Sequence, residues 1–325
     1  MRRREFITHL GAAAVASPLA TDFAQSAEKV WRVGYLSTIG PSDLSKAFLQ
    51  GLHDLGYVSG KNLVFELRDA QGKNERLGEL AADLVRIDVD LIATEGTPPT
   101  KAALQATGAI PIVFGSAQHP VEKGIVASLA QPGRNVTGMA LIADHAKPLE
   151  LLKEAVPEVS RVTFIYDPET RPGAYGEASL RTLQMEARKL GMTVQPMLLR
   201  DPDQTDTVFN ALAADTNGLL FENSVINIRA QKRICELALQ RRLPSVSSFR
   251  EFAVSGCLVS YGENLPDVYR RAASYVDKIL KGAKPSDLPV MQATTFDLVI
   301  NLKTAKVLGL QIPTSFIARA ADVIE

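Results

Sequence analysis

The polar residues best suited to bind or react stand directly after short apolar runs, where the strands of a sheet are expected to end. In a parallel sheet these ends share one edge, and small ligands usually bind in a crevice outside that edge. In the first half of the chain these residues are Ser37, Thr38, Glu95, Thr97 and Ser116. In the second half they are Asp167, Glu222, Asn223, Ser247 and Tyr261. Their hydroxyl, carboxyl and amide groups predict a site for a small polar solute. The simpler alternative is that the Ser, Thr and Asn residues only cap helices.

Motifs for familiar catalytic chemistry are missing from the sequence. It has no G-x-G-x-x-G after a strand, no G-x-x-x-x-G-K-[ST], no G-x-S-x-G and no H-E-x-x-H. Beyond residue 26 there are two cysteines and three scattered histidines, which do not make a structural zinc site on their own. We therefore expect no catalytic residue, no metal and no cofactor. A hydrolytic triad built on His53, His119 or His145 is the enzymatic alternative.

Charge and hydropathy exclude two classes of function. The 325 residues include 36 Lys plus Arg and 36 Asp plus Glu, so the formal net charge is zero. A protein that binds nucleic acid through its phosphates is expected to be visibly basic. No apolar run approaches the roughly 20 residues that a membrane-spanning helix needs. The length and the 46% of hydrophobic residues instead predict two domains with substantial cores.

Residues 1–26 have the three parts of an export signal. Arginines come first, a short Ala- and Gly-rich apolar stretch follows, and small residues at 24–27 form a plausible cleavage region. The segment RREFI at 3–7 fits the twin-arginine pattern. A basic Sec signal or a chance cluster is the alternative. We expect the signal to be cleaved and the product to be soluble in the periplasm. In that oxidising compartment Cys235 and Cys257 form either a disulfide or two buried free thiols.

The elements that must position the polar residues alternate between strands and helices. In the first half we predict strands over 33–36, 63–67, 91–94 and 110–114, and helices over 42–55, 75–86, 98–106 and 121–130. In the second half we predict strands over 162–166, 194–198, 219–221, 246–247 and 258–260. Helices are predicted there over 149–155, 174–190, 204–213, 226–241, 266–280 and 302–308. This alternation predicts an α/β fold of two doubly wound, parallel-sheet lobes with a ligand cleft between strand ends.

Two helix starts and three carboxylates suggest what the cleft could hold. The helices beginning at Ser42 and Thr97, each expected to be an N-cap, are predicted to point free amides at the crevice and to favour an anion. Asp167 and Glu222 lie across from them, and an amino acid would suit both sides. Glu95 instead favours an amine, unless it points to solvent or pairs with a nearby lysine. We hypothesise that Glu95 and at least one of the other two carboxylates contact a ligand with a cationic group.

From about residue 32 to residue 325 the chain resembles the ABC transporter substrate-binding proteins of the tryptophan/tyrosine type. The resemblance is carried by RVGYL at 32–36, FLQGLHDLGYVSGKN at 48–62, GTP at 96–98, IPIVF at 110–114, SLAQPGRNVTG at 128–138, SYG at 260–262, ILKGAKPSDLPV at 279–290 and INLKTAKVLGLQIP at 300–313. The family tends to have Gly, Asp and Gly where this sequence has Glu95, His119 and Cys257.

The resemblance implies a type I periplasmic-binding-protein fold, with two lobes joined by several crossovers that close on the ligand like hinged bodies. Lobe 1 would comprise 30–144 plus 259–284, and lobe 2 would comprise 145–258 plus 285–325. It also implies a monomer that delivers a small solute to the permease of an ABC importer in the inner membrane. An exported enzyme using the cleft, and a ligand-sensing partner of a membrane receptor, are the alternatives.

Overall fold

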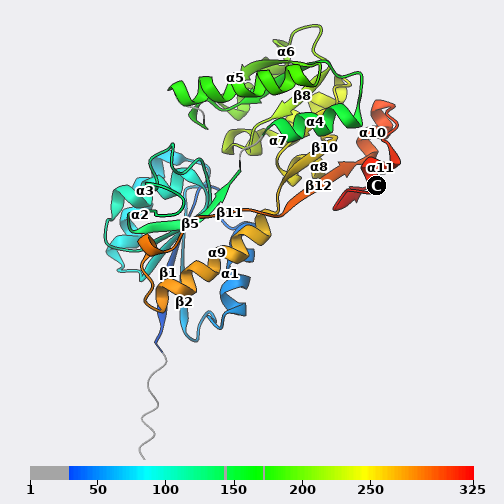
Figure 1. The fold of residues 1–325 in the computed structure, drawn as a ribbon. Helices are drawn as coiled ribbons and strands as arrows, with labels where there is room; N and C mark the ends of the chain where they lie inside the picture. The colour runs from blue at the N-terminus through cyan, green and yellow to red at the C-terminus, as the bar shows by residue number, and fades with distance from the viewer. Residues whose placement is uncertain (1–28, 143–144, 171–172) are drawn as a thin grey trace, which may run out of the picture.

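The chain forms two α/β lobes, one above the other in Figure 1. The computed structural model describes residues 29–142, 145–170 and 173–325. The predicted export signal over 1–26 lies outside these residues. Each lobe is built around one sheet that is covered by helices, as the alternation of strands and helices predicts.

The sheet of the first lobe is parallel throughout. Its strand order is β11-β5-β4-β3-β1-β2. The strands are β1 (Trp31–Ser37), β2 (Leu63–Asp69), β3 (Leu91–Thr94), β4 (Ile112–Gln118), β5 (Val136–Leu141) and β11 (Met291–Gln292). One face carries α1 (Asp43–Asp54) and α9 (Leu265–Leu280), and the other carries α2 (Leu77–Arg86) and α3 (Thr97–Ala106). Short turns of 3₁₀ helix occur at η1 (Asn74–Arg76) and η4 (Pro285–Asp287).

The sheet of the second lobe has the order β13-β12-β10-β9-β8-β6-β7, and β12 runs antiparallel to β10. Its strands are β6 (Arg161–Tyr166), β7 (Thr193–Leu198), β8 (Gly218–Phe221), β9 (Ser245–Ser247), β10 (Val259–Glu263), β12 (Phe296–Asn301) and β13 (Asp322–Ile324). Its helices are α4 (Ala146–Ala155), α5 (Gly173–Lys189), α6 (Thr205–Asn210), α7 (Val225–Gln240), α8 (Arg250–Val254), α10 (Leu302–Leu308) and α11 (Thr314–Ile317). The 3₁₀ turns are η2 (Pro168–Thr170) and η3 (Pro202–Gln204).

The cores of both lobes follow from the two-residue alternation of strand side chains. In β1, Tyr35 packs against Phe48 of α1, with ring centroids 5.3 Å apart, while the neighbouring Leu36 belongs to the core beneath α2 and α3. In β8, Phe221 stacks on Phe252 of α8 with centroids 5.5 Å apart, while Leu220 belongs to the core beneath α4 and α5. Each sheet therefore buries apolar side chains on both faces.

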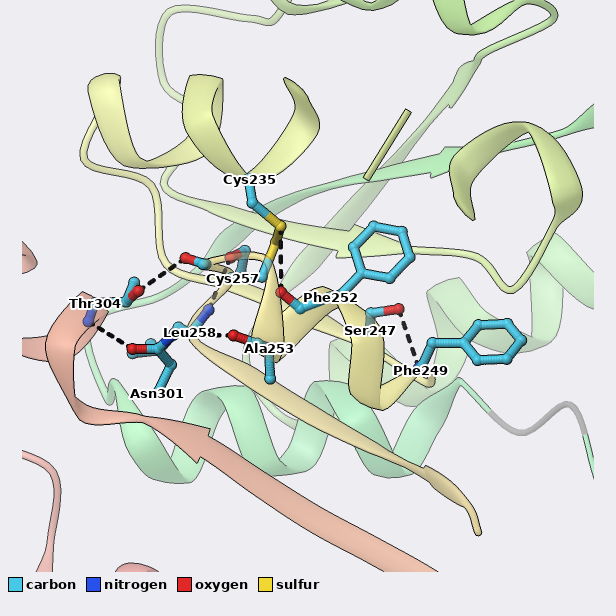
Figure 2. Close-up of a disulfide and its surroundings, with 11 residues drawn as sticks. Cys235, Ser247, Phe249, Phe252, Ala253, Cys257, Leu258, Asn301 and Thr304 are labelled. Carbon is cyan, nitrogen blue, oxygen red and sulfur yellow. Dashed lines mark hydrogen bonds between the residues drawn. A yellow bond between two sulfur atoms is a disulfide. The ribbon is translucent and has the colours of Figure 1, made fainter. Parts of the chain in front are cut away.

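A disulfide joins Cys235 of α7 to Cys257, which stands just before β10 (Figure 2). The two Cα atoms are 4.9 Å apart, within the usual range for a disulfide. Of the two alternatives that the sequence left open, a disulfide or two buried free thiols, the structure has the disulfide. Next to it, Thr304 donates to the carbonyl of Gly256 over 2.8 Å, so the start of α10 is tied to the same turn.

The chain crosses between the lobes after β5, after β10 and after β11, counting within the described residues. These crossings are tied to one another. The backbone N–H of Ile142 donates to the carboxylate of Glu263 over 2.6 Å. The N–H of Asn264 donates to the carbonyl of Thr295 over 3.1 Å, and the N–H of Ala293 donates to β5 over 3.2 Å. We call these three hydrogen-bonded crossing segments the hinge.

The hinge carboxylate gives a first prediction. Replacing Glu263 by Ala removes the acceptor for the N–H of Ile142, and we expect the free energy of unfolding to fall by about 1 kcal/mol in urea titrations. Glu263→Gln is the matched control, because its amide oxygen can still accept the bond and it should lose less. Equal stability of the Ala variant and the wild type would show that this bond does not stabilise the hinge.

Several sequence predictions are corrected by the sheet pairing. Residues 259–263 form β10 between β9 and β12, so they belong to the second lobe rather than to lobe 1. Residues 291–292 pair with β5, so they belong to the first lobe rather than to lobe 2. Both predicted lobe boundaries are too early, because the chain passes to the other lobe only after β10 and β11 have ended. The helix predicted over 121–130 is a series of turns, in which the N–H groups of Ile125 and Val126 both bond the carbonyl of Pro120.

Candidate ligand-binding site

The carboxyl ends of the two sheets face each other. Gln118, at the end of β4, donates from its side chain to the carbonyl of Asn223, which follows β8, over 3.2 Å. Arg229 of α7 donates to the carbonyl of Gly72, which follows β2, over 3.4 Å. We call these two edges, with the residues that follow each strand, the inter-lobe face. The candidate residues that end or follow a strand belong to it, whereas Ser116 and Tyr261, which were expected to follow strands, lie inside β4 and β10.

Glu95 lies at the centre of a set of hydroxyl groups on the first lobe. Its carboxylate accepts hydrogen bonds from Tyr35 (3.1 Å), Ser37 (3.1 Å) and Ser42 (3.4 Å). The set forms because β1 and β3 are neighbours in the sheet and Ser42 begins the helix that follows β1. Within the described residues no Lys, Arg or His forms an ion pair with Glu95, so the lysine alternative is not found.

Burial governs the protonation of this carboxyl group. It raises the pKa of Glu95 to about 7, the nearby charge of Asp69 adds to the rise, and the hydrogen bonds from the hydroxyls oppose it. Tyr269 of α9 is fully buried close by and shares a 2.8 Å hydrogen bond with Ser116. Near neutral pH, Glu95 therefore exchanges between a neutral and an ionised form.

The start of α3 differs from the prediction. Gly96, with φ of +90°, is the N-cap, and Thr97 is already the first helical residue. The next residues, Pro98–Pro99, have no N–H group, and the N–H of Thr100 bonds the carbonyl of Gly96 over 3.3 Å. The expected set of free amides is thus reduced to that of Thr97. The Thr97 hydroxyl accepts a bond from the N–H of Gln118 over 3.3 Å, which ties this helix start to the inter-lobe face.

Ser42 is the N-cap of α1, as the sequence predicts. Its hydroxyl accepts from the N–H of Ser45 while its own N–H donates to the Ser45 hydroxyl. Just before this helix, Ser37 is buried and accepts from the backbone N–H groups of Ile39 and Gly40. Thr38 is 3% exposed, and its hydroxyl has no hydrogen-bond partner among the described residues.

In the second lobe Asp167 and Glu222 are brought together at the ends of β6 and β8. Glu222 is 2% exposed and accepts from the N–H of Asp167 (3.1 Å) and the hydroxyl of Thr170 (2.5 Å). The side chain of Asn227 donates to the carbonyl of Glu222 over 3.0 Å. Ser224, directly after Asn223, caps α7. Glu222 is therefore bonded within its own lobe, and Asp167 is 5% exposed beside it.

The remaining candidates are placed separately. Ser247 is fully buried and accepts from the N–H of Phe249 over 3.3 Å (Figure 2). Tyr261 is partly buried and stacks on Phe296 with centroids 5.7 Å apart. Ser247 lies at the end of β9 and Tyr261 lies within β10, so their assignment to the site rests on sheet topology. Sequence reasoning missed four residues that bond the candidate residues: Tyr35, Tyr269, Gln118 and Thr170.

A cavity of about 240 Å³ lies beside the hinge on the first lobe. It is lined by residues that follow β4 and by the end of β5, including Glu122, Leu141 and Ile142. His119 also lines it and has a φ of +50°. No cluster of three or more metal-binding side chains occurs among the described residues, and none of their helices could span a membrane.

This chain is similar to known proteins in both sequence and fold. The family described as ABC transporter substrate binding protein matches residues 38–324. A tyrosine-binding protein of Clostridioides difficile is 26% identical over 82% of this chain and 76% of its own length. A conserved domain protein of Vibrio cholerae has a structure with a TM-score of 0.84 at 28% identity, covering 91% of this chain and all of that one. The L-Trp complex of an ABC domain from Streptococcus pneumonia has a TM-score of 0.83 at 23% identity, with the same coverage.

The two-lobe fold is that of the type I periplasmic binding proteins, which solved structures at 14% and 15% identity share. The chain belongs to the family of ABC transporter substrate-binding proteins, because the family match covers nearly all of the described residues. Members of this family bind small ligands for ABC transporters, and the family is one of binding proteins rather than enzymes.

Proposed function

We propose that this protein captures a small amino-acid-like solute between its lobes and delivers it, as a monomer, to the permease of an ABC importer in the inner membrane. The observation that carries the proposal is the inter-lobe face, where polar strand ends of both lobes meet at the bond between Gln118 and Asn223. The names of two relatives, which refer to tyrosine and L-Trp, support an amino acid as the solute class.

The proposed ligand contacts come from both lobes. The first lobe would contribute Ser37, Thr38, Glu95, Thr97 and Ser116, and the second would contribute Asp167, Glu222, Asn223, Ser247 and Tyr261. The buried and unpartnered hydroxyl of Thr38 supports this proposal, because a buried polar atom normally has a hydrogen-bond partner. A polar solute held against the first lobe would supply that partner.

We infer that the protein works in the periplasm after removal of residues 1–26. The disulfide between Cys235 and Cys257 supports an oxidising compartment, because such bonds persist outside the cytosol. The sequence of the first 26 residues supports export. Blocking the twin-arginine route by changing both Arg3 and Arg4 to Lys would distinguish it from the Sec route.

We expect L-tyrosine or L-tryptophan to raise the melting temperature of the mature protein in a saturable way. Binding to the folded state alone stabilises it by about 2.7 kcal/mol when the free ligand is at 100 times its dissociation constant. Thermal shift across the twenty amino acids identifies the ligand, and calorimetry should then give one site per chain.

Two outcomes would contradict parts of this proposal. Covalent conversion of the stabilising compound, followed by mass spectrometry, would favour an enzyme. The absence of any saturable shift across the twenty amino acids would exclude that ligand class and leave the family assignment intact. A urea-unfolded sample serves as the control for binding that does not depend on the fold.

A further inference from the structure

Glu95 is a partly buried carboxylate whose neighbours leave its charge uncompensated. Two other partly buried carboxylates do have cationic partners: Glu66 pairs with Arg68 over 3.2 Å, and Asp277 pairs with Lys281 over 2.7 Å. Glu95 has only hydroxyl donors, and no ion pair joins it to a cation within the described part of the chain. A charge that is removed from water without a counter-charge destabilises the protein.

The groups that surround Glu95 are neutral or acidic. From β1 it faces Tyr35, from the end of β2 it faces Asp69, and from α9 it faces Tyr269. Burial raises the pKa of both tyrosines well above the ordinary value, so they stay neutral and act only as hydrogen-bond donors or dipoles near neutral pH. The carboxyl is held in place by three hydroxyls, with negative charge added by Asp69.

The helix that follows Glu95 has only one free amide, that of Thr97, to offset this charge. A helix start normally presents several N–H donors to an anion. Here Pro98–Pro99 remove two of them, and the N–H of Thr100 is bonded to Gly96. This part of the inter-lobe face therefore offers acceptor oxygens and negative charge, which match a cationic group of a ligand and oppose a carboxylate.

We propose that Glu95 is a specificity-determining residue that receives the ammonium group of the solute and makes its capture depend on pH. The inference rests on the proposed function, because it names the chemical group that the solute must carry. A charge-assisted hydrogen bond between the ammonium and Glu95 supplies the missing counter-charge.

The pH dependence follows from the ionisation of Glu95. With its pKa at about 7, the carboxyl is mostly ionised at pH 8 and mostly neutral at pH 6. The ammonium group of a free amino acid is more basic than a peptide amino terminus, because it lies beside a carboxylate, and it stays mostly protonated at both. Only the ionised form pairs with the ammonium. The dissociation constant is therefore expected to rise about tenfold between pH 8 and pH 6.

The test compares wild type, Glu95→Gln and a matched control, Glu79→Gln, which alters an exposed carboxylate on α2. Dissociation constants are measured by calorimetry at pH 6, 7 and 8 for L-tyrosine, L-tryptophan and their amine-free analogues, 3-(4-hydroxyphenyl)propionate and 3-(indol-3-yl)propionate. We expect Glu95→Gln to weaken amino-acid binding at least about tenfold at pH 8, the effect of losing a hydrogen bond to a charged group, and to abolish the pH dependence. Wild type should reject the amine-free analogues, and Glu79→Gln should behave like wild type.

The possible failures are distinguishable. If wild type binds an amino acid and Glu95→Gln binds it equally well with the same pH profile, this inference is overturned and the proposed function stands. Equal binding of the amine-free analogues by wild type also overturns it. If wild type responds to none of the twenty amino acids, the proposed function fails and the inference fails with it. Circular dichroism of each variant confirms that a loss of binding is not a loss of the fold.

Discussion

Loss of the disulfide between Cys235 and Cys257 is expected to lower the free energy of unfolding by about 3 kcal/mol. The bond closes a loop of 22 residues. Closing a loop of this length lowers the conformational entropy of the unfolded chain, which stabilises the folded state by about 3 kcal/mol. Both cysteines are at most 1% exposed, so alanine at both positions adds no polar group to the core. Urea unfolding of the double variant measures the effect.

The wild-type protein under a strong reductant is the matched control for this experiment, because it keeps both sulfur atoms and loses only the bond. The reduced wild type and the double alanine variant should lose similar stability. An unchanged urea midpoint in both would show that the disulfide does not restrain the unfolded chain.

Replacing Gly138 by Ala is expected to cost about 3 kcal/mol or more. Gly138 has a φ of +150°, which side chains rarely adopt, and an added Cβ would lie 2.1 Å from the carbonyl oxygen of Phe114. Both atoms belong to paired backbones of β4 and β5, so the clash cannot be relieved by rotating a side chain. Overpacking and backbone strain each contribute about 1–3 kcal/mol.

Gly78→Ala is the control for this substitution. Gly78 is an exposed residue of α2, and an added methyl group there would have open space around it, so alanine should stabilise the helix by about 1 kcal/mol. Thermal melts of the two variants should therefore move in opposite directions. If Gly138→Ala melts with wild type, the close approach of β4 and β5 is not a constraint on the fold.

The Gly138 variant also has a consequence for the site. The register between β4 and β5 shifts between Phe114 and Ala117, and Ser116 lies within this irregularity. An added Cβ at Gly115 would come within 2.2 Å of the ring of Tyr269, so that glycine lets the ring approach the strand. Disturbing β4 at Phe114 should therefore also weaken the bond between Ser116 and Tyr269.

The regular elements of the fold could be predicted because their patterns are strong. The apolar run at 91–94 predicts the bounds of β3 correctly. The apolar repeat over 266–280 predicts all of α9 except its first residue. The strand β5 was missed because Gly138 interrupts its apolar run. The turns over 121–130 were mistaken for a helix because Ile125 and Val126 are adjacent buried residues, which carry no clear period.

The candidate site could be predicted only in part. Parallel topology places polar residues at one edge, which is why Glu95, Ser37, Asp167 and Glu222 fall into groups on the two lobes. Tyr35 lies inside a strand and Tyr269 inside a helix, so their pattern indicates core packing and conceals their hydroxyl groups. Their contribution depends on the distance between elements far apart in the sequence.

The crossings also determine the order in which the chain can fold during synthesis. The first lobe lacks α9 and β11 until residue 292 is available, and the second lacks β12 and β13 until residue 324 is available. A nascent chain that ends at residue 263 would leave α1 without α9, its main helical neighbour. Neither lobe can therefore finish folding on the ribosome before nearly the whole chain has emerged, which leaves a long interval in which targeting factors and chaperones meet an incomplete protein.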